Sequence, residues 1–251
     1  MAFRHIKVDP LTPNIGAVVE GVHLAEDHAD EVYAEINAAL WKHHVIFFRG
    51  QNLSPAEHSK LGSHFGEVTG HEFMRPVKGQ PDVHITDHDD VGPSGNASWH
   101  TDVTFRQRPT LVTLLQAKDL PPAGGDTLWA STGAAFDALP DPLKTMLLGL
   151  SAEHDFAHHM RRFWSGWGDQ YDGSEAALEK ELRQIRENPI AVHPAVINHP
   201  VTGRLSLFIN SNWTKKFVGM DLELSEQLLT LVKNWVKKPE FQMRYRWEEG
   251  D

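Results

Sequence analysis

The chain has 251 residues, of which 40% are hydrophobic and 23% charged, as is typical of a soluble globular protein. Its formal net charge of −10 weighs against general binding to nucleic acid or anionic membranes, which requires a basic surface. Because there is no cysteine, disulfides, cysteine-ligated zinc, iron–sulfur clusters and thiol catalysis are excluded.

The first hundred residues predict short strands and helices followed by a long loop. Residues 1–7 are basic but precede no signal-peptide core, and no apolar run reaches membrane-spanning length, so we expect a cytoplasmic protein. The apolar patterns predict, in chain order, strands at 3–8 and 15–19, a helix at 31–42, a strand at 43–48 and a helix that begins in the capping box Ser54-Pro55-Ala56-Glu57. Residues 69–98 are polar and irregular, and such a long loop in a compact domain is usually functional or mobile.

The rest of the chain continues as a mixture of strands and helices. We expect, in chain order, strands at 110–117 and 126–130, helices at 132–139 and 142–148, a strand at 152–156, a helix at 174–188, strands at 191–197 and 205–210, a helix at 225–238 and a strand at 241–247. Residues 157–173 are rich in aromatic side chains without a period, which is typical of a lid or a covered loop. No repeat or linker divides the sequence, so we predict a single α+β domain over residues 1–251.

The pattern His-x-Asp offers one candidate metal site. It occurs at His28-Ala29-Asp30, His88-Asp89-Asp90 and His100-Thr101-Asp102. The first lies just before a helix and the second in a turn-rich loop, whereas Trp99 and the segment Val103-Thr104-Phe105 place the third at the edge of a predicted strand. Successive side chains in a strand alternate, so His100 and Asp102 would project from one side and bind one metal ion together, as in a 2-His-1-carboxylate site.

Other catalytic motifs are missing from the sequence. It contains no Gly-x-Ser-x-Gly nucleophile elbow, no glycine-rich phosphate loop before a helix and no His-Glu-x-x-His zinc motif. A metal-dependent reaction at His100 and Asp102 is therefore favoured over nucleophilic catalysis.

Two motifs carry a resemblance to a known family. The run from Asn96 through Trp99-His100-Thr101-Asp102-Val103-Thr104-Phe105 and the run Gly124-Gly125-Asp126-Thr127-Leu128-Trp129 together closely resemble the TauD/TfdA family of Fe(II)- and 2-oxoglutarate-dependent dioxygenases. Further similar segments lie at 152–156, 193–194, 199–204 and 241–247, so the resemblance spans almost the whole chain.

The resemblance implies a fold, cofactors and site residues. The fold would be a double-stranded β-helix (jelly roll) with outer helices, and the protein would use Fe(II), 2-oxoglutarate and O2, releasing succinate and CO2. His100 and Asp102 would bind iron, Thr127 would bind 2-oxoglutarate, and His71 and Asn96 would face the substrate. From the residues alone, Thr127 also suits an ordinary strand, and His71 and Asn96 suit a loop and a turn.

The substrate pocket departs from the pattern of taurine dioxygenase. Met74 stands where an aromatic hydroxyl is expected, His159-Met160 replaces a small polar residue and Phe, and Trp213 replaces Phe. His159 and Trp213 are therefore further candidates for substrate contact, although Met160 and Trp213 also suit core packing. These changes leave taurine or an alkyl sulfonate, a sulfate ester and an aryloxy acid open as the small-molecule substrate.

The C-terminal part of the family pattern is not in this sequence. The distal iron-binding histidine and the arginine that binds 2-oxoglutarate would lie beyond Asp251, so we expect a chain truncated at its C-terminus. That expectation keeps a non-catalytic jelly-roll binding protein open as the alternative function. A zinc hydrolase is disfavoured because no nearby Glu or His completes a zinc ligand set. The resemblance also suggests a homo-oligomer.

Overall fold

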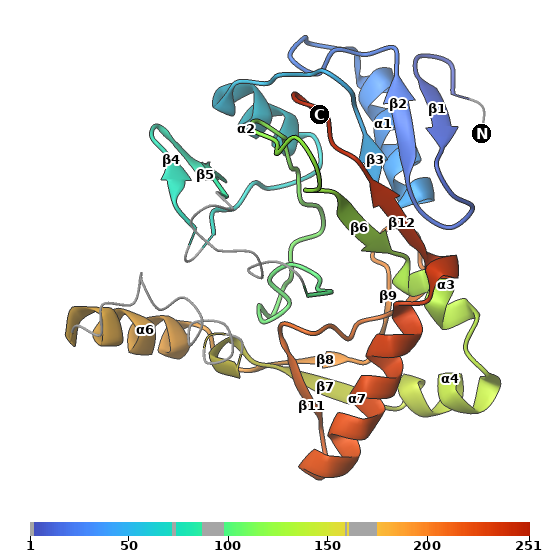
Figure 1. Cartoon of the computed structure of the whole chain (residues 1–251), viewed down its shortest axis with the longest axis vertical. Coiled ribbons are helices and arrows are strands. Elements are labelled where there is room, and N and C mark those ends of the chain that lie inside the picture. The colour runs from blue at the N-terminus through green and yellow to red at the C-terminus, as the bar shows by residue number, and fades with distance from the viewer. Residues whose placement is uncertain (1–2, 72–73, 87–97, 159, 161–174) are drawn as a thin grey trace.

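The N-terminal residues form a small sheet covered by a helix. The computed structural model describes residues 3–71, 74–86, 98–158, 160 and 175–251 (Figure 1). Strand β1 (Lys7–Pro10) pairs antiparallel with β2 (Ala17–Glu20), which pairs in parallel with β3 (Ile46–Phe47). Helix α1 (Asp30–His43) buries Tyr33, Ile36, Ala39 and Leu40. These elements confirm the predicted order of strand, strand, helix and strand.

Helix α2 (Pro55–Ser63) begins where the capping box predicts. The Ser54 side chain accepts a hydrogen bond from the Glu57 N–H, and the Glu57 carboxylate accepts one from the Ser54 N–H at 2.8 Å. Two of the N–H groups that a helix start leaves without backbone partners are thereby satisfied.

The middle of the chain contains both a missed hairpin and a wrong strand. Strands β4 (Pro76–Val77) and β5 (Gln80–His84) pair antiparallel within the segment predicted as loop. They were missed because β4 has only two residues and Val83 is the only aliphatic residue of β5. Residues 110–117 were predicted as a strand and instead run without regular structure. Leu114 of this segment packs against the N-terminal core, the hydrophobic cluster that includes Val19, Ile36 and Leu61. Ala117 exchanges backbone hydrogen bonds with residues 250–251.

The C-terminal half builds three further small sheets. Strand β6 (Thr127–Ala130) pairs antiparallel with β12 (Gln242–Tyr245), β7 (Ser151–His154) lies between β8 (Ala191–Pro194) and β11 (Thr214–Phe217), and β9 (Val196–Asn198) pairs with β10 (Leu205–Leu207). The helices are α3 (Thr132–Asp137), α4 (Asp141–Leu148), α6 (Glu175–Glu187) and α7 (Leu222–Val236), with a 3-10 turn η1 (Pro239–Phe241). The largest core cluster packs α3 and α7 against these strands.

The C-terminal strand β12 pairs with β6 and packs against β3 of the N-terminal sheet. Figure 1 shows β12, in red, running beside β6 toward the sheet of β1, β2 and β3. Phe47 of β3 stacks on Tyr245 of β12 with ring centroids 3.6 Å apart, and Met243 is buried in the same cluster. The backbone N–H of Gln51 donates to the carbonyl of Gly250 at 2.6 Å. The N-terminal layer and the C-terminal strand therefore share one core.

The fold class is mixed, with helices covering several sheets of two or three strands. The α and β content confirms the α+β prediction, while the strands of the described residues form no closed barrel. Within the same residues, no helix combines the length and the apolar character needed to cross a membrane.

We expect the turn between β1 and β2 to require glycine at position 16. Gly16 has φ +90°, and a Cβ there would overlap the sulfur of the buried Met243. Gly16→Ala is therefore expected to lower the free energy of unfolding, because the new Cβ strains the backbone and clashes with Met243. Gly50→Ala is the matched control, since Gly50 has φ +62° and a Cβ there meets none of the described atoms within 4 Å. Urea unfolding should show a loss for Gly16→Ala that exceeds the control by about 1–2 kcal/mol. Equal losses would contradict this prediction.

Candidate metal centre

The segment that carries His100 and Asp102 is a turn, not the predicted strand. Residues 102–105 form the turn, in which the Arg106 N–H donates to the Val103 carbonyl at 3.0 Å. Val103 has φ +44°, a conformation that β-branched residues rarely adopt and that costs about 1–3 kcal/mol. The alternation rule therefore does not apply here. The two side chains nevertheless meet, with His100 Nε2 3.3 Å from Asp102 Oδ1.

The His100 ring is oriented by the backbone next to it. Its Nδ1 lies 2.7 Å from the carbonyl oxygen of Ser98, which can only accept, so Nδ1 carries a proton. In the neutral ring the lone pair is then on Nε2 and points at Asp102. Burial lowers the pKa of His100, but the hydrogen bonds to Asp102 and Ser98 outweigh it, so the pKa is raised above its usual value. A proton or a metal cation is favoured at this position.

The Asp102 carboxylate has a different partner for each oxygen. Oδ1 faces His100, and Oδ2 accepts a hydrogen bond of 2.9 Å from the Thr113 hydroxyl. The hydrogen bond to His100 is the main reason that the pKa of Asp102 is lowered, and Thr113 and the charge of His71 act in the same direction. The carboxylate is therefore held in its anionic form. No motif in the sequence pointed to Thr113, which lies in the segment predicted as a strand.

A buried polar network holds the chain directly after Asp102. The Thr104 hydroxyl lies 2.8 Å from His154 Nδ1 and accepts a hydrogen bond of 2.9 Å from the Asn210 side-chain amide. Thr104 and His154 are fully buried, and Asn210 is nearly so. His193 Nε2 lies 2.9 Å from the Thr104 carbonyl oxygen. Since the network comes from distant segments, it fixes Thr104, and with it the strained turn, to the C-terminal sheets.

The residues just before His100 are fixed to the loop that follows Asn210. The Ser98 hydroxyl donates to the Asn212 side chain at 2.5 Å, and the Ser211 N–H donates to the Trp99 carbonyl at 3.0 Å. The segment around His100 and Asp102 is thus held at both ends.

The structure places Trp213 beneath this segment. Its ring centroid lies 4.6 Å from that of Phe105, and the side chain is 4% exposed in a cluster with Val103, Phe156 and Met160. This location agrees with core packing, the alternative left open for both Trp213 and Met160.

The other candidates lie apart from the pair or outside the described residues. The His71 N–H donates to His84 Nε2 at 3.2 Å, and His71 is near enough to Asp102 to influence its pKa. Thr127 lies on β6, where its hydroxyl accepts a hydrogen bond of 2.8 Å from the Trp247 indole. Asn96 and His159 fall outside the described residues.

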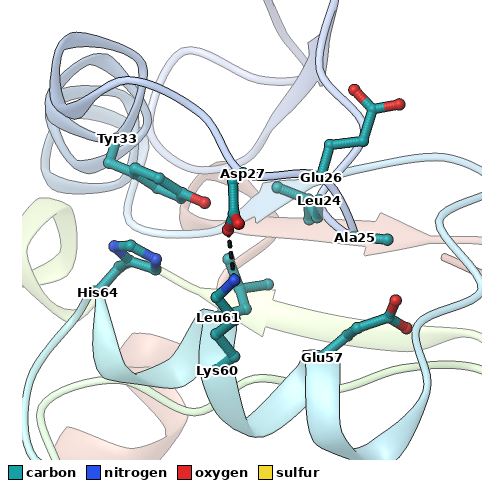
Figure 2. A pocket seen from close by; sticks show the side chains of 9 residues that line it. All are labelled: Leu24, Ala25, Glu26, Asp27, Tyr33, Glu57, Lys60, Leu61 and His64. Atoms are coloured by element: carbon teal, nitrogen blue, oxygen red, sulfur yellow. Dashed lines mark hydrogen bonds and ion pairs between the residues drawn. The ribbon is translucent and has the colours of Figure 1, made fainter.

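A shallow hollow that is open to solvent lies apart from His100 and Asp102 (Figure 2). It is lined by Leu24, Ala25, Glu26, Asp27, Tyr33, Glu57, Lys60, Leu61 and His64, none of them a predicted site residue. Asp27 and Lys60 form an ion pair, and Tyr33 stacks on His64 with centroids 3.6 Å apart. Because these polar groups already pair with each other, the hollow is not the candidate centre.

The pair His100 and Asp102 fits two ligand positions of an Fe(II) site. When His100 is protonated, its Nε2 proton lies between the ring and the Asp102 carboxylate; when it is neutral, the Nε2 lone pair faces the carboxylate oxygen, and a metal cation bound there would take the place of that proton. In the described part of the chain, no group of three or more His, Cys, Asp or Glu side chains forms a metal-binding cluster. The described residues thus offer two candidate ligands, one fewer than the three protein ligands of a 2-His-1-carboxylate site.

Comparisons with known proteins agree on one family. A family model described as "Taurine catabolism dioxygenase TauD, TfdA family" matches residues 7–251. The chain is 32% identical to an alkylsulfatase of Acinetobacter baylyi over 255 residues, covering 99% of this chain and 76% of that protein. It is 32% identical to an α-ketoglutarate-dependent sulfate ester dioxygenase of Pseudomonas putida over 248 residues, covering 98% and 79%. The crystal structure of a taurine dioxygenase from Burkholderia xenovorans matches with a TM-score of 0.78 at 31% identity, covering 98% of this chain and 78% of that chain.

Proposed function

The chain belongs to the TauD/TfdA family of 2-oxoglutarate-dependent non-heme iron dioxygenases, and from this membership we propose that it hydroxylates a small sulfated or sulfonated organic acid. The observation that carries the proposal is the pairing of His100 Nε2 with Asp102 Oδ1 at 3.3 Å, in the motif that resembles the family's iron site. The reaction depends on Fe(II), 2-oxoglutarate and O2 and releases succinate and CO2.

His100 and Asp102 would hold the metal. When bound, iron together with 2-oxoglutarate and O2 supplies the oxidising power that replaces a substrate C–H bond by C–OH. The protein's part is to present one imidazole nitrogen and one carboxylate oxygen, each oriented by its own hydrogen bond, to Ser98 and Thr113 respectively. The third iron ligand stays a prediction from the resemblance.

The roles of the remaining candidates are proposals. Thr127 would donate its hydroxyl proton to a 2-oxoglutarate carboxylate, a role that is supported by its oxygen already accepting from Trp247. His71 would face the substrate acid, since its charge acts on Asp102. Asn96 and His159 would contact substrate as the resemblance implies, and Trp213 would support the pocket from below.

We propose a sulfate ester as the first substrate class to test. The relatives of A. baylyi and P. putida are named for sulfate esters, which favours this class over taurine. Met74, Met160 and Trp213 replace residues of the taurine enzyme's pattern and are compatible with a longer apolar substrate. Hydroxylation of the carbon next to the ester oxygen gives an unstable product that releases an aldehyde and sulfate.

The finer architecture and the setting of the enzyme are also proposals. A single dioxygenase domain built on a double-stranded β-helix is supported by the TM-score of 0.78 with a taurine dioxygenase structure. The family resemblance supports a homo-oligomer, and we propose the cytoplasm as its location. The net charge of −10 favours a small-molecule substrate over nucleic acid or an anionic membrane as the binding partner.

A substrate panel tests the proposed function. The full-length protein is incubated with Fe(II), 2-oxoglutarate and one acid at a time: an alkyl sulfate, an alkyl sulfonate, taurine or an aryloxyacetate. We expect succinate and inorganic sulfate in equal amounts with the alkyl sulfate. Binding of Mn(II) without succinate from any acid would instead support the non-catalytic binding protein.

A further inference from the structure

The two candidate metal ligands are too exposed for packing alone to orient them. The side chain of His100 is 28% exposed and that of Asp102 is 47% exposed. The terminal torsion of an aspartate is soft and roughly two-fold, so a half-exposed carboxylate can rotate and exchange its two oxygens. Something other than packing must therefore keep one oxygen of Asp102 facing His100.

The Thr113 hydroxyl is placed to do this, and we propose that Thr113 is a positioning residue of the metal centre. It donates a hydrogen bond of 2.9 Å to Asp102 Oδ2, the oxygen that does not face His100. With Oδ2 engaged, Oδ1 stays 3.3 Å from His100 Nε2 as the oxygen available to a cation. This inference rests on the proposed function, because it assumes that the pair holds iron.

The arrangement is parallel to that of His100. Ser98 accepts from Nδ1 and turns Nε2 toward the site, while Thr113 donates to Oδ2 and turns Oδ1 toward the site. Each ligand thus has one hydrogen-bonding partner that leaves a single donor atom for the metal. Such partners set the orientation and the proton state of metal ligands, and their removal typically costs about 10–100-fold in metal affinity.

Thr113 itself is held by a different part of the molecule from the turn that carries Asp102. The neighbouring Leu114 is half-buried against the N-terminal core cluster. Farther along, Ala117 exchanges two backbone hydrogen bonds of 3.0 Å with residues 250–251, and Lys118 Nζ donates to the Leu53 carbonyl at 2.9 Å. The turn after Asp102 is instead fixed to the C-terminal sheets through Thr104. The hydrogen bond from Thr113 therefore joins the two halves of the fold at the metal centre.

Metal binding by three variants tests this role. Free Mn(II) is measured by electron paramagnetic resonance during titration of the wild type, Thr113→Val, Thr113→Ser and Thr110→Val. Valine has nearly the shape of threonine without the hydroxyl, serine keeps the hydroxyl, and Thr110 is an exposed threonine on the same segment. We expect Thr113→Val to raise the Kd for Mn(II) about 10-fold or more, with the serine variant and the Thr110→Val control within about 3-fold of wild type.

The outcomes separate this inference from the function on which it rests. A Thr113→Val protein with the wild-type Kd would overturn the positioning role and leave the iron site standing. Equal weakening in Thr113→Val and Thr113→Ser would show that shape, not the hydroxyl, matters, and would also overturn it. A wild type that binds no Mn(II) would overturn the metal site and the proposed function together. Since Thr113 is exposed and loses a single hydrogen bond in Thr113→Val, melting followed by circular dichroism should shift by at most about 2–4 °C in that variant. The protein therefore stays folded during the titration, and a Kd change reports the site and not the fold.

Discussion

Asp102→Asn is expected to abolish succinate formation and to raise the Kd for Mn(II) by more than about 100-fold, the upper end of what losing a ligand's hydrogen-bonding partner costs. The substitution keeps the shape of the side chain but removes the negative charge. Its amide oxygen can still accept from Thr113, which turns the NH2 group toward His100 Nε2, where the wild type has Oδ1. A donor then occupies the position at which a cation needs an acceptor. Mn(II) titration and succinate quantification measure the two effects.

Asp30→Asn is the matched control for this prediction. Asp30 belongs to the same short pattern, His28-Ala29-Asp30, but lies in the first turn of α1, and His28 Nε2 approaches the His23 carbonyl oxygen at 2.9 Å. We expect this variant to bind Mn(II) and form succinate as the wild type does. An Asp102→Asn protein with wild-type turnover, or an Asp30→Asn protein that is equally impaired, would contradict the assignment of the site.

The protein is expected to lose stability as the pH falls below about 6.5, and His154 is a principal cause. Burial, followed by the charge of His193, lowers the pKa of His154 from 6.5 to about 3. The unfolded chain therefore takes up a proton that the folded protein excludes, and the stabilisation present above pH 6.5 decreases at up to about 1.4 kcal/mol per pH unit. Between pH 7 and pH 4.5 we expect a loss of about 2–3 kcal/mol from this residue, measured by urea unfolding at both pH values.

His154→Gln isolates this contribution from those of other histidines. The pKa values of His43, His44, His58 and His199 are also lowered, mainly by burial, so they act in the same direction. Glutamine does not titrate and can still hydrogen-bond to Thr104. The variant is expected to be less stable at pH 7 but to lose less stability on acidification. A pH dependence as steep as that of the wild type would show that His154 is not responsible.

Local patterns predicted most of the helices and strands correctly. The helical spacing of Val32, Ile36 and Leu40 predicted α1, and the capping box predicted the start of α2. These signals succeed because a helix or strand that buries one face repeats its apolar residues with its own period. The misses have specific causes. Strand β11 contains two lysines and a register shift at Thr214–Lys216, so it does not alternate in hydrophobicity. Strand β4 has only two residues, and Val83 is the only aliphatic residue of β5, so neither strand gives a clear hydrophobic signal.

The segment 110–117 shows the opposite error. Its run of aliphatic and β-branched residues predicted a strand, but Leu114 packs against the N-terminal core and Ala117 hydrogen-bonds to residues 250–251. Such a run favours an extended, partly buried chain. It cannot report whether another strand lies beside that chain to accept its hydrogen bonds.

By itself, the sequence determined most of the helices and strands, the exclusion of thiol chemistry and the candidate pair His100 and Asp102, because these depend on residue types and on spacing along the chain. Only the tertiary structure decided how the two side chains meet. The predicted strand is a turn with Val103 at positive φ, and it is held by Thr104, His154 and Asn210. Thr113, the second partner of Asp102, lies eleven residues farther along the chain. Contacts between segments far apart in the sequence leave no local period or motif, and the orientation of the two candidate metal ligands depends on such contacts.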